Sequence, residues 1–244
     1  MLTYTKKYTV PYYETDANGN MKLPSLFNIA LQLSGEQSHT LGISDDWLKE
    51  TYNYAWVVVE YDVTIHRLPR FSEVITMATF AKSYNKFFCY RDFVFYAENG
   101  ETLLTINSTF VLIDITSRKV AHVEDDIVAP YQSEKISKIV RGHKYTALSA
   151  TPLEKSYHVR FNDIDQNGHV NNSKYFDWMT DVLGYDFLSS HVPARIHLKY
   201  SKEVLYGATV TSRVDLVGVQ SFHDIASEGK HAQAEMTWRE KEDA

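Results

Sequence analysis

The sequence contains a single cysteine, Cys89, in 244 residues. One thiol cannot form a disulfide within the chain or a zinc site built on paired cysteines, so we expect a reducing compartment, the cytoplasm. Glycine and proline are also scarce, at 10 and 6 residues, while hydrophobic residues make up 44% of the chain. This balance excludes collagen-like, low-complexity and largely disordered proteins. The composition therefore predicts a folded globular protein.

Excess positive charge and long apolar runs are missing as well. The 25 lysines and arginines are outnumbered by 31 aspartates and glutamates, which leaves a formal net charge of −6. An acidic chain of this kind argues against nucleic-acid binding. No stretch approaches the roughly 18 apolar residues of a membrane span, and no apolar run follows the first lysines. We therefore expect no membrane span and no signal peptide.

The chain contains an internal repeat. Six residues of an aromatic segment and of the polar turn after it recur 149 residues later: Tyr8, Val10, Tyr12, Asp16, Asn18 and Gly19 correspond to Tyr157, Val159, Phe161, Asp165, Asn167 and Gly168. In each copy the alternating segment, at 7–13 or 156–161, leads through the turn into a helical pattern. This repeated order of strand, turn and helix indicates a duplicated structural unit.

Each half continues with one helix and four strand-like runs. The first helix is expected at 24–41, and the second begins after Asn172 or Ser173. The strand-like runs lie at 54–66, 73–84, 87–96 and 101–114 in the first half, and at 195–203, 208–217, 221–227 and 232–239 in the second. Turns at 98–100 and 228–230 have hairpin length. We therefore predict an α+β protein with two tandem hotdog domains, each a central helix wrapped by an antiparallel β-sheet.

The join between the two units lies where the apolar periodicity lapses. We predict a first domain over 1–130 without a complete catalytic set, a linker over 131–152, and a second domain over 153–244 that carries the catalytic residues. Four basic residues gather in the linker: Lys135, Lys138, Arg141 and Lys144. Together with Glu134 they leave a local charge of +3. This stretch is either a solvated linker or a docking surface for an acidic partner.

The polar turn of the second copy carries residues of several chemical types. Residues 163–172 read Asp-Ile-Asp-Gln-Asn-Gly-His-Val-Asn-Asn. The pattern Asp-x-Asp-x-Asn-Gly opens a calcium loop, but position twelve counted from Asp163 is Lys174, where an EF-hand needs a bidentate glutamate. We therefore expect no metal and no cofactor at this turn.

A histidine distinguishes the second turn from the first. Asp165 and Asn167 have counterparts in the first copy, and turn hydrogen bonds alone explain both residues. His169, however, stands where the first copy has Asn20, so the turn itself does not require an imidazole. A histidine titrates near neutral pH and can transfer protons. We interpret His169 as an added function and predict one active site per chain.

The stretch 165–172 resembles the Asp-x-Asn-x-His-Val-Asn-Asn motif of the acyl-acyl-carrier-protein (acyl-ACP) thioesterase family, whose plant and bacterial members are tandem hotdog proteins. Tyr-Ser-Lys-Glu at 200–203 is similar to the family's short stretch ending in a catalytic glutamate. The resemblance covers nearly the whole chain. It implies catalytic roles for Asp165, Asn167, His169 and Glu203.

One position departs from the family pattern. Plant members place a cysteine directly after the glutamate, and here that residue is Val204. A cysteine nucleophile is therefore unavailable there, and we expect Cys89 to be a small buried hydrophobe. By charge pattern alone Glu203 could equally be a solvated charge at a strand end, beside Lys199 and Lys202.

The resemblance suggests the following hypothesis for the roles of the site residues. Glu203, held near His169, accepts a proton from water or attacks directly, and the sequence leaves both open. Asn167 positions the water or the substrate carbonyl, and Asp165 orients the imidazole or Asn167. Free backbone N–H groups near Asn172 would stabilise the developing oxyanion.

The resemblance implies hydrolysis of acyl-ACP thioesters to free fatty acid and carrier protein, which ends chain elongation in fatty acid biosynthesis. An acyl-coenzyme A thioesterase and a non-catalytic acyl-thioester binding protein stay as alternatives. The expected partner is acyl carrier protein bearing a phosphopantetheine-linked acyl chain. Because one chain supplies both hotdog units, a monomer is sufficient, and pairing of exposed edges would give a homodimer.

Overall fold

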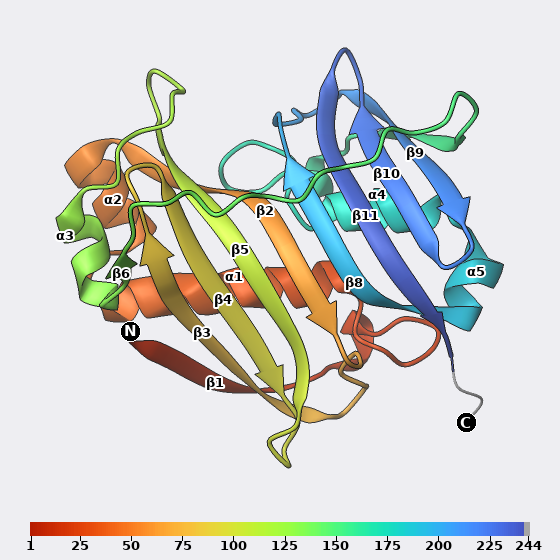
Figure 1. Cartoon of the computed structure of the whole chain (residues 1–244), viewed down its shortest axis with the longest axis horizontal. Helices are drawn as coiled ribbons and strands as arrows, with labels where there is room; N and C mark the ends of the chain where they lie inside the picture. The colour runs from red at the N-terminus through yellow and green to blue at the C-terminus, as the bar shows by residue number, and fades with distance from the viewer. Residues whose placement is uncertain (242–244) are drawn as a thin grey trace.

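The computed structural model describes residues 1–241, and the strands of this part form one continuous antiparallel sheet (Figure 1). The first half contributes β1 (Thr3–Thr9), β2 (Tyr54–Ile65), β3 (Val74–Tyr84), β4 (Phe88–Tyr96), β5 (Thr102–Asp114) and the short β6 (Glu134–Lys135). The second half contributes β7 (Leu153–His158), β8 (His191–Tyr200), β9 (Thr209–Val217), β10 (Gln220–Ala226) and β11 (Lys230–Glu240). Their order is β1-β3-β4-β5-β2-β8-β11-β10-β9-β7, and β6 adds to β3 in the parallel sense.

Two helices lie against the concave face of this sheet, one from each half. These are α1 (Leu23–Thr40) and α4 (Lys174–Asp181) (Figure 1). Shorter helices complete the described chain: α2 (Asp45–Tyr52), α3 (Asp125–Val128), α5 (Tyr185–Ser190), and the 3-10 turns η1 (Tyr12–Glu14), η2 (Ala129–Tyr131) and η3 (Phe161–Asp163). The arrangement confirms the predicted α+β class, with a central helix wrapped by antiparallel strands in each half. No helix of residues 1–241 is long and apolar enough to span a membrane.

Helix α1 forms where the sequence predicted it because apolar residues surround its first half. Leu26, Phe27 and Leu33 are each at most 1% exposed, so the sheet and the second half cover the helix on most sides. Burying side chains of this size contributes about 1.5 to 3 kcal/mol each. Gly42 follows the helix with φ +74°, the left-handed conformation that ends many helices.

The two halves join edge to edge between β2 and β8, where Glu60–Thr64 pair with 195–199 in the antiparallel sense. Beneath this seam the ring of Phe27 on α1 stacks on Phe176 of α4, with 4.0 Å between ring centroids. One hydrophobic cluster runs through both halves. The duplicated units therefore share a core and are not merely tethered to each other.

Seven of the predicted strands agree with the structure to within two residues. The segments predicted at 7–13 and 156–161 were placed three or four residues too late, since β1 is Thr3–Thr9 and β7 is Leu153–His158. A third difference concerns the candidate site. The run predicted at 195–203 is β8, which begins at His191 and ends at Tyr200. The backbone N–H groups of Ser201 and Lys202 both donate to the carbonyl of His231, so the chain leaves the ladder there. Glu203 consequently lies in a loop, not on a strand.

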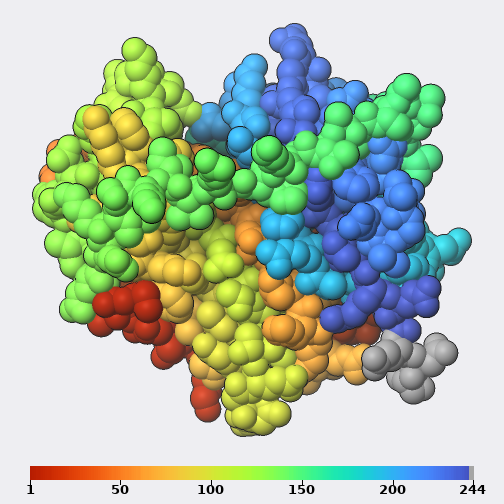
Figure 2. All heavy atoms as spheres, in the orientation of Figure 1, coloured from red at the N-terminus to blue at the C-terminus, as the bar shows by residue number. Residues whose placement is uncertain are grey.

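Residues 136–150, called the strap below, cross the face of the sheet opposite the helices (Figures 1 and 2). The His143 imidazole Nε2 lies 2.8 Å from a carboxylate oxygen of Glu235 and its ring stacks on His197, while its backbone N–H donates to Glu60. Gly142 passes so close to Glu60 that a Cβ would collide with the carboxylate. The strap is therefore bound to both halves and is not a solvated linker.

Candidate active site

In the loop between β7 and α4, a polar side chain of the loop and backbone hydrogen bonds hold the backbone in place. A carboxylate oxygen of Asp165 accepts the Asn167 backbone N–H at 2.8 Å, and the Asp165 N–H donates to the carbonyl of His169 at 2.8 Å. Gly168 adopts φ +80° at the tip, which favours glycine. The first copy repeats the same bonds at Asp16. The prediction that Asp165 makes turn hydrogen bonds is therefore confirmed.

His169 and Glu203 meet across two loops. The Nε2 atom of His169 lies 3.0 Å from Oε2 of Glu203, and the two side chains are 22% and 41% exposed. The loops are tied together by the backbone N–H of Val170, which donates to the carbonyl of Val204 at 2.9 Å. Val204 is itself 2% exposed, so its buried side chain anchors the segment that carries Glu203. The structure therefore brings together the predicted histidine and glutamate.

The first half has no equivalent of this pair. There the backbone N–H of Met21 donates to the carbonyl of Pro69. This bond is the counterpart of the bond from Val170 to Val204 in the second half. The positions equivalent to His169 and Glu203 are consequently Asn20 and Leu68, both buried at 7% exposure. An amide and an aliphatic side chain cannot exchange a proton with water as imidazole and carboxylate do.

Asp165, Asn167 and Asn172 line a cavity of 270 Å³ that extends into the first half. The walls come from α1 and from β2, β3, β4 and β5, and six apolar residues among them are Leu31, Trp56, Val58, Ala81, Phe110 and Val128. Cys89 also lines it, and burial raises the pKa of the thiol to about 12. The second half thus contributes three polar residues to the lining, and the first half contributes the rest, which includes the charged Asp45 and Arg91.

The start of α4 differs from the expectation of several free N–H groups. The backbone N–H of Ser173 donates to the Asn171 side chain, and that of Lys174 donates to the Asn171 carbonyl. Among the described residues, the Asn172 backbone N–H and the Asn167 side-chain amide have no acceptor. These two groups and the Asn172 side-chain amide lie on residues that line the cavity, and all three are donors available to a developing negative charge.

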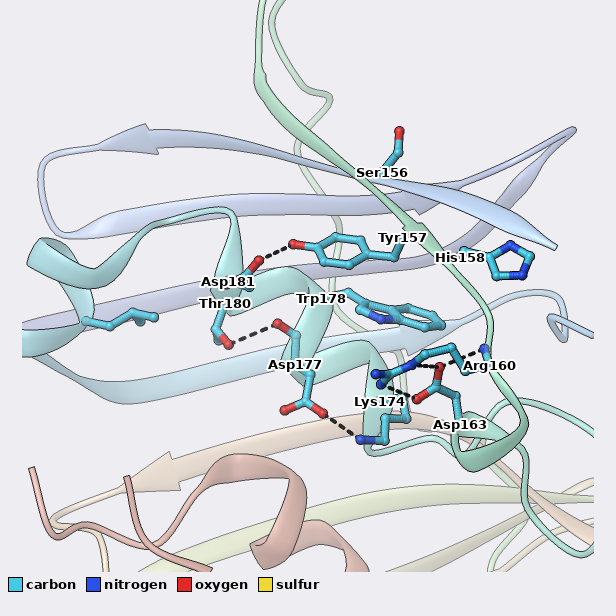
Figure 3. Close-up of a pocket in the computed structure, with 11 residues that line it drawn as sticks. Ser156, Tyr157, His158, Arg160, Asp163, Lys174, Asp177, Trp178, Thr180 and Asp181 are labelled. Carbon is cyan, nitrogen blue, oxygen red and sulfur yellow. Dashed lines mark hydrogen bonds and ion pairs between the residues drawn. The ribbon is translucent and has the colours of Figure 1, made fainter. Parts of the chain in front are cut away.

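A larger and more open hollow of 580 Å³ lies elsewhere, between β7, η3 and α4 (Figure 3). Its charged side chains are already paired with one another: Arg160 with Asp163, Lys174 with Asp177, and Lys155 with Asp181. None of the four predicted catalytic residues lines it. These pairs leave the hollow without a free charged group suited to catalysis among the three pairs named.

One residue beside the pair was not predicted. Arg118, in the turn after β5 of the first half, makes an ion pair with Oε2 of Glu203. The two residues are 85 positions apart, and no sequence motif joins them. The described residues contain no cluster of three or more histidine, cysteine, aspartate or glutamate side chains suited to a metal.

Comparison with known proteins assigns the chain to a family. Residues 1–131 match the model of the acyl-ACP thioesterase N-terminal domain, and residues 146–240 match that of the C-terminal domain. The chain therefore belongs to the acyl-ACP thioesterase family.

Among solved structures, a putative oleoyl thioesterase from Lactobacillus plantarum is similar, with a TM-score of 0.94 and 35% identity over 99% of this chain and 98% of that one. The 12:0-ACP thioesterase from Umbellularia californica shares the fold, with a TM-score of 0.87 and 20% identity over 98% of each chain. Both comparisons confirm the predicted hotdog architecture.

Curated plant relatives are more distant and longer. The chloroplastic oleoyl-acyl carrier protein thioesterase of Coriandrum sativum is 24% identical over 235 residues, which cover 86% of this chain and 62% of the relative. The chloroplastic palmitoyl-acyl carrier protein thioesterase of Gossypium hirsutum is 23% identical over 83% of this chain and 52% of the relative. The chain thus spans between half and two thirds of the length of these relatives.

Proposed function

We propose that this protein hydrolyses acyl-ACP thioesters to free fatty acid and carrier protein, and so ends chain elongation. The observation that carries the proposal is the 3.0 Å contact between His169 Nε2 and Glu203 Oε2, in loops whose Asp165 and Asn167 open onto the long cavity. A protein that only binds acyl thioesters has no use for a proton-transfer pair. Family membership and the named relatives support acyl-ACP as the substrate.

In the proposed reaction, water attacks the thioester carbonyl carbon while Glu203 removes its proton. The C–S bond then breaks, the acid leaves, and the proton that Glu203 took from water passes to the phosphopantetheine thiolate. Nε2 of His169 lies 3.0 Å from Oε2 of Glu203, so the imidazole has the proposed role of orienting the carboxylate that accepts the proton. Cys89 takes no part, because burial keeps its thiol protonated and no other cysteine exists.

Asn167 and Asn172 have the proposed role of holding the carbonyl oxygen. The Asn167 amide and the Asn172 backbone N–H are unused donors beside the cavity, and removing one donor aimed at a developing oxyanion commonly costs about 10² to 10³ in rate. Asp165 acts through the loop, because its carboxylate fixes the backbone of Asn167. The acyl chain extends from there into the first half.

We further propose a single active site per chain, in the second half, with residues 1–130 completing the core and housing the acyl chain. The absence of an imidazole and a carboxylate at Asn20 and Leu68 supports this division. Each chain supplies both hotdog units, so a monomer is sufficient and a homodimer is compatible. A cytoplasmic location fits a chain with one thiol.

The proposal is tested by fatty acid release from matched acyl-ACP and acyl-coenzyme A substrates of several chain lengths. We expect turnover on the acyl-ACP series, reduced about 10² to 10⁴-fold in His169→Ala and in Glu203→Gln. His158→Ala, at an exposed histidine of the same half, is the matched control and should retain wild-type activity. Faster turnover of the coenzyme A series would change the substrate, and tight binding without turnover would refute the catalytic assignment.

A further inference from the structure

We propose that Arg118 is a positioning residue for Glu203, supplied by the first half across the boundary between the two halves. The inference rests on the proposed function and deepens it. The Arg118 guanidinium contacts Oε2 of Glu203, the same oxygen that faces Nε2 of His169. The carboxylate is therefore held by one cation from the first half and by one imidazole from the second.

The turn that presents Arg118 is rigidly built. Arg118 adopts φ +58°, a left-handed conformation that non-glycine residues rarely adopt. Its backbone N–H donates to the Asp114 carbonyl, and a carboxylate oxygen of Asp114 accepts the N–H of Ser117 at 2.6 Å. Asn53 donates to the hydroxyl of Thr116 at 2.8 Å. These bonds fix the backbone from which the Arg118 side chain extends to Glu203.

Glu203 has no comparable support of its own. It lies beyond the end of β8, and its side chain is 41% exposed. The Val204 side chain and the Val170 bond hold the backbone, but His169 and Arg118 are the only partners of the carboxylate among residues 1–241. Without Arg118 the flexible side chain would keep a single contact, and a displacement of about 1 Å can cost 10²-fold in rate.

The contacts also distinguish the two oxygens of Glu203. His169 and Arg118 both meet Oε2, whereas Oε1 has no partner in the part of the chain that the structure describes. Oε1 is then the atom free to take the proton from water, while Oε2 fixes the orientation of the carboxylate. Arg118 touches neither water nor substrate in this account, so it acts through Glu203.

Lys119 offers a matched control. It is the next residue, carries the same charge and is exposed, and its side chain has no ion-pair or hydrogen-bond partner among the described residues. Any effect of local positive charge on substrate attraction should appear in both variants. An effect of the contact with Glu203 should appear only at Arg118.

The experiment compares Arg118→Met, Arg118→Lys and Lys119→Met on a carrier-free acyl thioester, which removes carrier docking from the measurement. We expect kcat of Arg118→Met to fall about 10 to 100-fold with KM within twofold of wild type. Arg118→Lys should recover part of the loss, since an ammonium can still contact Oε2, and Lys119→Met should match wild type. Thermal unfolding of each variant checks that all are folded.

Four outcomes would overturn the inference. These are an unchanged kcat in Arg118→Met, equal losses at Arg118 and Lys119, a loss seen only with carrier-bound substrate, and a loss explained entirely by the unfolded fraction. The function itself is tested separately by the wild type. If the wild type releases no fatty acid, the proposed function fails. If the wild type is active, Glu203→Gln is inactive and Arg118→Met is active, only this inference fails.

Discussion

At the level of single residues, the active pair combines firm placement with access to water. His169 and Glu203 are held by the backbone bond between Val170 and Val204, yet their side chains are 22% and 41% exposed. The proposed hydrolysis needs water as a reactant, so full burial of this pair would exclude one of the two reactants. The buried Val204 at the position after Glu203 contributes anchoring and no nucleophile.

The lone thiol gives a prediction at this scale. Because burial raises the pKa of Cys89 to about 12, the thiolate is scarce at pH 8 and the native protein should resist iodoacetamide. Mass spectrometry should show rapid alkylation only after unfolding in denaturant. Cys89→Ser should retain hydrolysis. Equally fast labelling of native and unfolded protein would contradict the assigned environment.

The sequence predicted which residues lie together at the candidate site better than it predicted their surroundings. Asp165, Asn167 and His169 stand in one motif, and comparison of the two copies singled out the imidazole. Arg118 and the free Asn172 N–H could not be predicted in the same way. Arg118 meets Glu203 because the two halves pack together. The Asn172 N–H has no acceptor among the described residues, because Asn171 accepts the N–H groups of the residues that follow Asn172.

At the level of elements, hydrophobic periodicity predicted α1 and most strands, but it did not predict the short helices. Helix α2 carried usable signals, since Ser44 caps it by accepting the Trp47 N–H and two aspartates occupy its first turn. The end of β8 was not predictable from alternation. It depends on the His231 carbonyl, which captures two backbone N–H groups from a distant part of the chain.

The strap supplies the prediction for this scale. Gly142→Ala should lower the free energy of unfolding by about 0.5 to 1.5 kcal/mol, because the new methyl group displaces the Glu60 carboxylate from the His143 N–H that it accepts. Gly229→Ala, where an added Cβ meets nothing within 4 Å, is the control. Urea unfolding measures the free energy of unfolding of both variants. Equal values would show that the strap and Glu60 accommodate the methyl group without loss of stability.

At the level of the whole molecule, carrier docking depends on a local basic surface, because the chain is net negative. Of the four linker residues, Lys135 makes an ion pair with Asp125 at 2.8 Å and lies beside the Tyr84 ring. The exposed basic side chains of the strap, Lys138, Arg141 and Lys144, are the remaining candidates. The candidate docking surface is thus smaller than the four residues that the sequence offered.

Replacing Lys138, Arg141 and Lys144 together by glutamate should raise KM for acyl-ACP several-fold, through like-charge repulsion of an acidic carrier. KM for a small acyl thioester should not change. Lys7→Glu, at an exposed lysine on β1, controls for the general change in charge. Equal effects on both substrates, or an equal effect of Lys7→Glu, would refute docking on the strap.

The strap also has a consequence for how the protein responds to proteases. Its exposed Lys138, Arg141 and Lys144 are natural cutting points for trypsin, yet β2 pairs with β8 and Phe27 stacks on Phe176 without help from the peptide chain between the halves. A single nick there should leave two fragments that migrate separately on a denaturing gel but elute as one particle. We therefore expect the two halves to stay folded together after the chain between them is cut.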